Sequence, residues 1–214
     1  MKNVLRVTTG LFEESSVTSI LMEELLVQLQ AGGENFQIVE RNFRENPVPH
    51  LDADWLQALS TPAADRSEEQ QTKVNYSDSL IAEIQAADTL VIALPMYNFS
   101  VPSMLKAWID HISRAGVTFK YTTAGAEGLL QDKKVYLVSA MGGVHEIGQT
   151  DFLRPYMKLI MGFIGLNDVD FITAAGLNMG DQRRAQGLAE ARAEIKNLVS
   201  QHNFEQNVPQ EKAA

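Results

Sequence analysis

The sequence predicts an α/β fold in which helices cover both faces of a parallel sheet. Strand-like and helix-like patterns alternate along the chain, and such alternation is typical of a parallel sheet. The segment Leu90–Leu94 is apolar at every position, as expected for a strand buried on both faces. With 214 residues, 45% of them hydrophobic, the chain is long enough for one domain with a well-buried core.

The first part of the chain contains two strand patterns with a helix between them. Val4–Thr8 is β-rich and predicts the first strand, whereas Phe36–Arg41 alternates apolar and polar residues as an edge strand would. Ser15–Thr18 is a cluster of helix-capping residues. Apolar residues at helical spacing follow this cluster until Gly32-Gly33, where the helix is expected to end.

The region Pro47–Arg66 is the largest insertion between the expected elements. Asp52–Leu59 predicts a short helix within it, and Ser60–Arg66 reads as a polar loop. Four large apolar residues, two here and two in a later helix, suit either the core or a subunit interface: Trp55, Leu56, Trp108 and Ile109.

The second part continues the alternation. Ser67 and Gln70 have the spacing of a capping box and predict the start of a helix that ends near Ala87. The later elements are, in order, a strand at Thr89–Leu94, a helix at Ser103–Arg114, an extended segment or hairpin at Ala115–Asp132, a strand at Val135–Ser139, a helix at Phe152–Ile164, a strand at Val169–Thr173 and a helix at Gln182–Gln201. The polar tail His202–Ala214 is expected to fray.

Five strands favour a flavodoxin-like three-layer sandwich, with a five-stranded parallel sheet in the order 2-1-3-4-5. We therefore expect a single domain over residues 1–201, followed by a tail over residues 202–214. In this order the carboxyl ends of strands one, three and four lie side by side, and ligands bind at that edge of open α/β sheets.

Composition excludes several classes of function. The net charge is −9, which argues against non-specific binding to nucleic acid or to anionic membranes. The chain has no cysteine, so disulfides, thiolate nucleophiles and cysteine-ligated metals are excluded, and no other metal-like cluster is expected. No apolar stretch approaches the roughly 20 residues of a membrane span. We expect a cytoplasmic protein without a signal peptide.

The loop after the first strand suits a phosphate. Thr8-Thr9-Gly10 and Ser16-Val17-Thr18 supply hydroxyls and free amides at a helix N-terminus, which can bind an anion without any cation. The alternative interpretation is an ordinary capped helix. Because the G-x-G-x-x-G and Walker patterns are absent, a monophosphate fits better than a pyrophosphate.

Two further loops suit a flat heterocycle. In Pro95–Phe99, Tyr97 and Phe99 flank Asn98, whose amide both donates and accepts hydrogen bonds; the alternative is a turn fixed in the core by its aromatic residues. In Ala140–Gly143, the paired glycines allow the backbone to approach a ligand closely, although many such pairs mark ordinary turns. His145 follows this loop, and it suits either of two roles: a proton donor to a ligand or an ordinary solvated side chain.

Long motifs identify a family that the chain resembles. The segments Pro95-Met96-Tyr97-Asn98-Phe99, Val101-Pro102-Ser103, Leu105-Lys106 and Arg114 through Tyr121 closely resemble those of bacterial FMN-dependent NADH:azoreductases, also called FMN-dependent NADH:quinone oxidoreductases. The segments Met141–His145 and Gly162–Gly165 also match, so the likeness covers nearly the whole chain. The resemblance implies a flavodoxin-like fold, a homodimer, and one FMN per subunit near the interface.

The resemblance also implies which residues form the site. The expected cofactor-binding residues are Thr9, Gly10, Ser16, Val17, Thr18, Pro95, Met96, Tyr97, Asn98, Phe99, Ala140, Met141, Gly142 and Gly143. The expected substrate pocket consists of Asn98, Phe99, Tyr121, His145 and Phe163. Two positions depart from the family, whose members often carry Ser at position 10 and Arg at position 141.

The implied activity is a two-electron, ping-pong reduction of quinones and aromatic azo compounds by NADH. The flavin N5 would take the hydride, so no catalytic side chain is expected. No basic cluster suits a 2′-phosphate, which favours NADH over NADPH as the donor. Two alternatives remain, a flavodoxin-type FMN electron carrier without turnover of small molecules and a flavin-binding regulatory protein.

Overall fold

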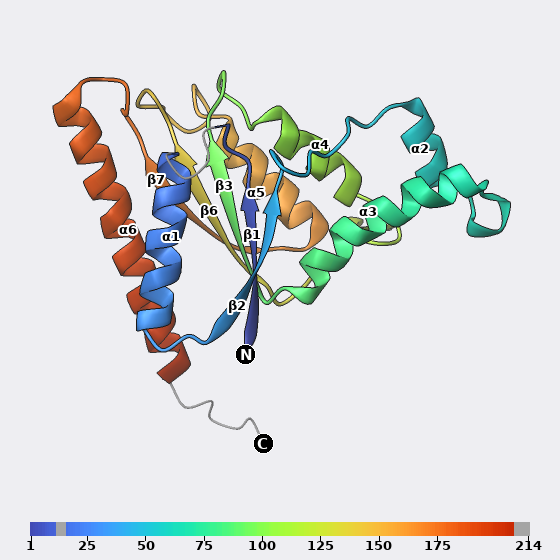
Figure 1. Cartoon of the computed structure of the whole chain (residues 1–214), viewed down its shortest axis with the longest axis horizontal. Helices are drawn as coiled ribbons and strands as arrows, with labels where there is room; N and C mark the ends of the chain where they lie inside the picture. The colour runs from blue at the N-terminus through green and yellow to red at the C-terminus, as the bar shows by residue number, and fades with distance from the viewer. Residues whose placement is uncertain (12–15, 208–214) are drawn as a thin grey trace.

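The computed structural model describes residues 1–11 and 16–207, and its centre is a five-stranded parallel sheet (Figure 1). The sheet order is β2-β1-β3-β6-β7. Its strands are β1 (Lys2–Thr8), β2 (Phe36–Asn42), β3 (Thr89–Pro95), β6 (Lys134–Ala140) and β7 (Asp168–Ala174), and all neighbours pair in parallel. Counted among the sheet strands alone, this is the predicted order, because β4 and β5 form a separate antiparallel pair.

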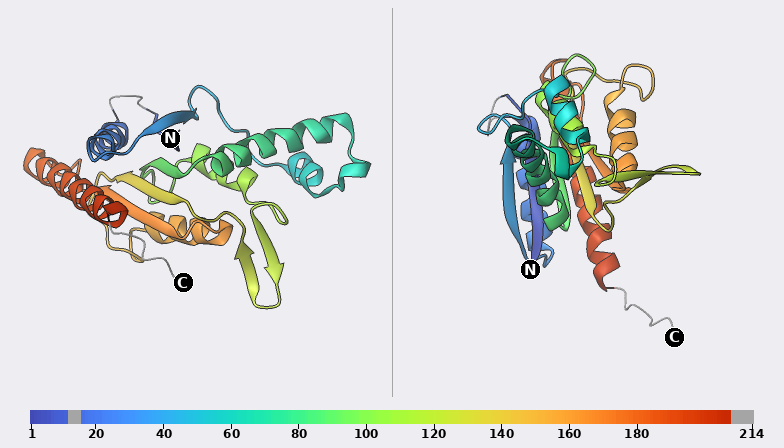
Figure 2. Two further views of the ribbon diagram at one scale, coloured as in Figure 1. Left: turned by 90° about the horizontal axis from the view of Figure 1, so that it is seen from below. Right: turned by 90° about the vertical axis from the view of Figure 1, so that its right-hand side faces the viewer.

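Helices form a layer on each face of the sheet (Figures 1 and 2). One layer contains α1 (Val17–Ala31) and α6 (Asp181–Asn207), and the other contains α3 (Glu68–Ala86), α4 (Ser103–Ile112) and α5 (Leu153–Ile164). Every residue of β3 is buried, which confirms the prediction drawn from its apolar sequence. The core therefore has two parts, one on each side of the central strand.

The segment expected to be extended or a hairpin is a hairpin. Strands β4 (Phe119–Thr122) and β5 (Gly125–Gly128) pair in antiparallel fashion and project from the body of the domain (Figure 2). Its base is tied to the end of α5 by a hydrogen bond from Leu130 N to Ile164 O of 3.0 Å. A side chain at Gly128 would collide with the main chain at Gly165, so these segments touch through their backbones.

The last helix is longer than predicted. It continues to Asn207, whereas the sequence predicted an end at Gln201 and a fraying tail from His202. One turn after the buried Val199, His202 Nε2 lies 2.6 Å from Glu34 Oε1 beyond α1, so the helix still contacts the domain there. Residues 208–214 of the expected tail lie outside the described residues.

The insertion contains the expected short helix, α2 (Ala53–Ser60), followed by a 3-10 turn, η2 (Ala63–Asp65). Asp52 caps α2 by accepting a hydrogen bond from Trp55 N. The capping box predicted for α3 is present, with Ser67 and Gln70 each bonding the other's main chain. Within the described residues, no helix has the length and apolar character needed to cross a membrane.

The four large apolar residues that suited either the core or a subunit interface lie in different environments. Trp108 and Ile109 belong to the core, at 0% and 2% exposure. Trp55 packs edge-on against His111, with ring centroids 4.5 Å apart, whereas Leu56 is 61% exposed.

Candidate functional site

The carboxyl ends of β1, β3 and β6 lie side by side, as predicted, because β3 pairs with both neighbours. Thr9 Oγ1 donates a hydrogen bond of 2.8 Å to Ala93 O, which ties the first loop to β3. Met96 N donates one of 2.9 Å to Ala140 O, which ties the second loop to β6. The three loops therefore form one continuous edge of the sheet.

The first loop leaves the start of α1 without a side-chain cap. Ser16 occupies the N-cap position, but its hydroxyl lies 2.8 Å from Thr18 Oγ1 instead of bonding a main-chain amide of the first turn. A Cβ at Gly10 would lie 3.3 Å from Ser16 Oγ, so the glycine keeps the backbone close to this hydroxyl. An uncapped helix end with neighbouring hydroxyls fits an anion. The predicted capping residue Ser15 lies outside the described residues.

The second loop is a tight turn with an unusual backbone. Asn98 and Phe99 have φ values of +49° and +67°, and Tyr97 and Ser100 exchange two main-chain hydrogen bonds of 3.1 and 3.0 Å. Such a conformation is unfavourable for an aromatic residue, and it is characteristic of functional sites. It leaves the Phe99 ring 55% exposed, edge-on to His145 at a centroid distance of 5.5 Å.

Both glycines of the third loop lie against the side chain of another residue. A Cβ at Gly142 would lie 2.7 Å from Asn178 Nδ2, and one at Gly143 would lie 3.0 Å from His145 Nε2. Met141, next to them, is 1% exposed and belongs to the core, so its side chain anchors the loop from below. The two glycines therefore bring the backbone of this loop close to the side chains of Asn178 and His145.

Sequence reasoning missed the loop that supports these glycines. Residues 175–178 follow β7, and their amides bond the carbonyls of the third loop. Their hydrogen bonds come from the main chain, so no side-chain pattern in the sequence indicates these bonds. The one available indication is Gly176, which has a φ of +75°.

The five residues of the expected substrate pocket form two groups within one chain. Asn98 and Phe99 lie beside His145 at the edge of the sheet. Tyr121 and Phe163 lie elsewhere, and both contact Phe119: its ring centroid is 5.4 Å from that of Tyr121 and 4.3 Å from that of Phe163. Among the described residues, no ring contact joins the two groups. Tyr121 is 76% exposed on the hairpin.

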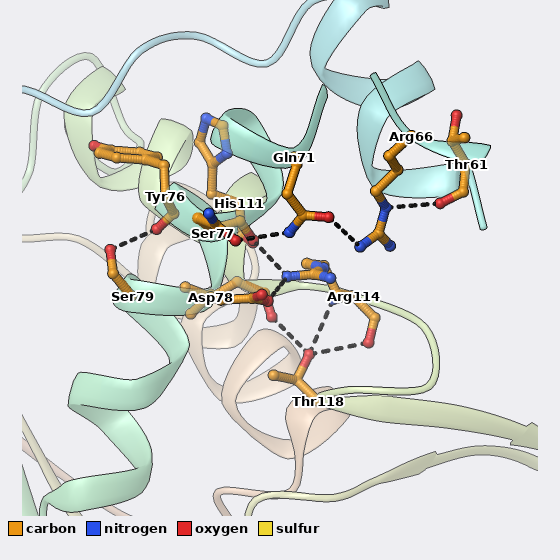
Figure 3. Close-up of polar contacts among 12 residues, drawn as sticks. Thr61, Arg66, Gln71, Tyr76, Ser77, Asp78, Ser79, His111, Arg114 and Thr118 are labelled. Atoms are coloured by element: carbon orange, nitrogen blue, oxygen red, sulfur yellow. Dashed lines mark hydrogen bonds and ion pairs between the residues drawn. The ribbon is translucent and has the colours of Figure 1, made fainter. Parts of the chain in front are cut away.

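The hairpin starts from a well-ordered polar network (Figure 3). Arg114 Nη1 donates a hydrogen bond of 3.1 Å to Ser77 Oγ and forms an ion pair with Asp78, both on α3. Thr118 Oγ1 accepts from Arg114 N at 2.9 Å and donates to Ile112 O at 2.6 Å. These bonds fix the chain between α4 and the hairpin, so the direction in which the hairpin projects is defined.

A hollow of about 650 Å³ at the amino ends of the strands is a poor alternative site. Its lysines already have partners. Lys134 forms ion pairs with Asp168 and Asp170, and Lys133 Nζ donates to two carbonyls at the end of α3. Cations that are paired in this way are not available for an anionic ligand.

Comparison with known proteins agrees with the fold. Residues 2–199 match a family described by its flavodoxin-like fold. The FMN-dependent NADH:quinone oxidoreductase of Cellvibrio japonicus is 46% identical over 200 residues, covering 94% of this chain and 100% of that protein. FMN-dependent NADH:quinone oxidoreductase 2 of Pseudomonas fluorescens is 44% identical over 199 residues, covering 93% and 100%.

Solved structures are also similar. An azoreductase from Bacillus anthracis superposes with a TM-score of 0.85 at 27% identity, covering 94% of this chain and 100% of that chain. An FMN-dependent NADH-azoreductase from the same species, in complex with FMN, has a TM-score of 0.83 at 26% identity, covering 95% and 100%. By fold and by sequence, this chain belongs to the flavodoxin-like family of FMN-dependent NADH:quinone oxidoreductases and azoreductases.

Proposed function

We propose that this protein is an FMN-dependent enzyme that reduces quinones and aromatic azo compounds with electrons from NADH. The observation that carries the proposal is the edge of the sheet where the loops after β1, β3 and β6 meet, next to the uncapped start of α1. Relatives at 46% and 44% identity are named FMN-dependent NADH:quinone oxidoreductases. Similar solved structures are azoreductases, one of them in complex with FMN.

The residues present fit an FMN. The uncapped start of α1, with Thr9, Gly10 and residues 16–18, would hold the phosphate without a cation. Residues 95–99 and 140–143 would hold the ring, since they follow the neighbouring strands β3 and β6 at the same edge of the sheet. When bound, FMN supplies the transfer of a hydride and of electron pairs, which no side chain of the protein can perform.

The side chains around this cradle bind flat aromatic compounds and exclude water. Phe99 and His145 form one wall, held by the strained turn and by their edge-to-face contact. Each aromatic contact of this kind contributes about 1 kcal/mol beyond the area it buries. Such a wall selects compounds by shape, which suits both quinones and azo compounds.

We further propose that the protein is a homodimer that buries the outer face of α5. Phe152, Leu159 and the hairpin residue Tyr121 are 54%, 69% and 76% exposed, although all three are large and apolar. Tyr156 and Phe163 lie on the same stripe as Phe152 and Leu159, at helical spacing. A second copy would cover this face and complete the pocket with the Tyr121 group.

The dimer is tested by the molar mass in solution. Replacing Leu159 with Glu places a charge in the proposed interface, and we expect a shift towards monomer with weaker retention of FMN. Light scattering after size-exclusion chromatography measures the mass. A wild-type protein that is monomeric at micromolar concentration would contradict the proposal.

The cytoplasm, where NADH is available, is the compartment that we propose.

The catalytic proposal is tested by steady-state kinetics. We expect NADH oxidation that depends on a quinone, with parallel double-reciprocal lines, and a lower rate with NADPH. Intersecting lines would contradict the ping-pong order. The alternative is an electron carrier of the flavodoxin type, which would bind FMN but show negligible turnover of NADH with a quinone.

A further inference from the structure

The loop after β7, residues 175–178, bonds three successive carbonyls of the third loop. We call it the β7 loop. The bonds are Leu177 N to Met141 O at 3.1 Å, Asn178 N to Gly142 O at 2.9 Å and Gly176 N to Gly143 O at 2.8 Å. In a regular strand, successive carbonyls bond alternately to the strand on one side and to the strand on the other. Three successive carbonyls that bond to the same side therefore depart from the regular hydrogen-bond pattern of a sheet.

This arrangement determines where the amides of the third loop point. All peptide bonds of the described chain are trans, so each N–H is directed opposite to the carbonyl of its own peptide group. The carbonyls of Met141, Gly142 and Gly143 face the β7 loop. The N–H groups of Gly142, Gly143 and Val144 therefore face away from it. Because β6 lies between β3 and β7, this is the side of the second loop.

These three amides have no partner within the described residues. None of them donates a hydrogen bond there, whereas Met141 N, one residue earlier, donates to Ala174 O at 2.8 Å. Gly142 and Gly143 are half-buried and Val144 is exposed, so these donors are accessible to a ligand. Successive amides that face one way form an anion-binding concavity.

The β7 loop is itself held firmly. Gly176 has a φ of +75°, and a Cβ there would lie 2.6 Å from Cγ of Arg183, so the α6 side chain packs against it. The Asn178 carboxamide fills the space that a side chain at Gly142 would take. The β7 loop thus contacts the third loop through both its main chain and a side chain.

We propose that the β7 loop is a positioning element, which holds the amides of Gly142, Gly143 and Val144 towards an electron-rich edge of the bound cofactor. Leu177 and Asn178 are the positioning residues, and the Val144 amide is an additional donor. The cofactor part rests on the proposed function, because FMN is the ligand whose ring carbonyls would accept these bonds. The orientation of the amides is a property of the protein alone.

Two variants at one position separate the main chain from the side chain. Asn178→Pro removes both the carboxamide and the N–H that bonds Gly142 O, whereas the matched Asn178→Ala removes the carboxamide only. We expect the proline variant to bind FMN at least 10-fold more weakly than the alanine variant, a difference of about 1.4 kcal/mol. We also expect a lower midpoint potential of the bound flavin, because fewer donors stabilise negative charge on its reduced form.

The cofactor-free protein provides an independent measurement. In its ¹⁵N–¹H spectrum, we expect the Gly143 amide to shift most in Asn178→Pro, because it shares a peptide group with the carbonyl that loses its donor. We expect a much smaller shift in Asn178→Ala. This readout distinguishes the two proposals: if wild-type protein fails to bind FMN while the shift occurs, the proposed function is wrong and the positioning is correct.

A double-mutant cycle covers the case in which the proline variant does not fold. Gly142→Ala would bring a Cβ to 2.7 Å from Asn178 Nδ2, so we expect it to weaken FMN binding at least 10-fold in the wild-type background. In the Asn178→Ala background the collision is removed, and we expect a loss of 3-fold or less. Equal losses in both backgrounds, or equal affinities, potentials and spectra for the two Asn178 variants, would overturn the proposal.

Discussion

Phe99 offers a direct test of whether the candidate site stores backbone strain. Its φ of +67° belongs to the left-handed region, which is favourable for glycine but not for an aromatic residue. Phe99→Gly and Phe99→Ala both remove the ring, which is 55% exposed, but only glycine adopts this φ without strain. Comparing the stabilities of the two variants therefore isolates the free-energy cost of the left-handed backbone conformation at position 99.

The expected difference follows from two opposing effects. The left-handed conformation costs a residue with a Cβ about 1–2 kcal/mol. Glycine loses about 0.4–1 kcal/mol more than alanine through its freedom in the unfolded chain. We therefore expect Phe99→Gly to be more stable than Phe99→Ala by about 0.8 kcal/mol, or about 2–3 °C in Tm for a chain of this length.

Urea unfolding of the cofactor-free variants measures this difference, and Val27 provides a control. Val27 lies in the interior of α1 and is 52% exposed. There we expect the usual order, with alanine about 0.5–1 kcal/mol more stable than glycine. If alanine equals or exceeds glycine at position 99 as well, the turn is not strained and the argument is wrong. Both Phe99 variants should lose kcat/KM to a similar extent, since both lack the ring.

Three further predictions concern stability. Burial lowers the pKa of His111, whose Nδ1 is buried without a partner among the described residues, and the hydrogen bond from its Nε2 to Pro49 O offsets this effect only in part. The free energy of unfolding should therefore fall as the pH drops below about 6.5, the unfolded-state value, and His111→Phe should flatten this slope. Burial raises the pKa of Tyr136 to about 12. The stability that the protonated tyrosine contributes should therefore be complete below pH 10 and lost as the pH rises from 10 to about 12. Tyr136→Phe should abolish this loss of stability at alkaline pH. Gly128→Ala should destabilise the protein by about 1–3 kcal/mol and increase hydrogen exchange in the hairpin, because its Cβ would lie 2.0 Å from Gly165 N.

Each of these has a contrary outcome. His111 lies among Trp55, Tyr76 and the main chain of Pro49, with Asp52 and Asp110 as the nearby carboxylates (Figure 3 shows part of this cluster). An unchanged acid slope in His111→Phe would assign the slope to other groups. Ionisation of every tyrosine near pH 10 would show that Tyr136 is not protected. Wild-type stability in Gly128→Ala, with Glu127→Ala at an exposed position of the same strand as the control, would show that the hairpin base is not packed against α5.

The central sheet was predictable because its signals are local and strong. An apolar run such as β3 has one stable environment, a strand buried on both faces, and this places it at the centre. The capping box at Ser67 likewise fixes the start of α3 within a few residues. The predicted end of α6 was too early by less than two turns. The contact of His202 with Glu34 holds the helix against the domain beyond that point, and it joins residues far apart in sequence.

The candidate site was predictable only in part. The fold brings the three loops to one edge, so topology and motif together located them. The left-handed backbone of Phe99 contradicts local preference and is imposed by the reciprocal bonds of Tyr97 and Ser100. The separation of Tyr121 from His145 depends on where the hairpin projects, and the β7 loop acts through its main chain. None of these leaves a pattern in the sequence.

The central claim is that the three loops jointly hold one FMN, and the visible spectrum of the purified protein tests it most directly. We predict flavin absorption bands that elute with the protein at one equivalent per chain, bleach on anaerobic addition of NADH and return when a quinone is added. Folded protein that neither retains nor takes up FMN would contradict the account.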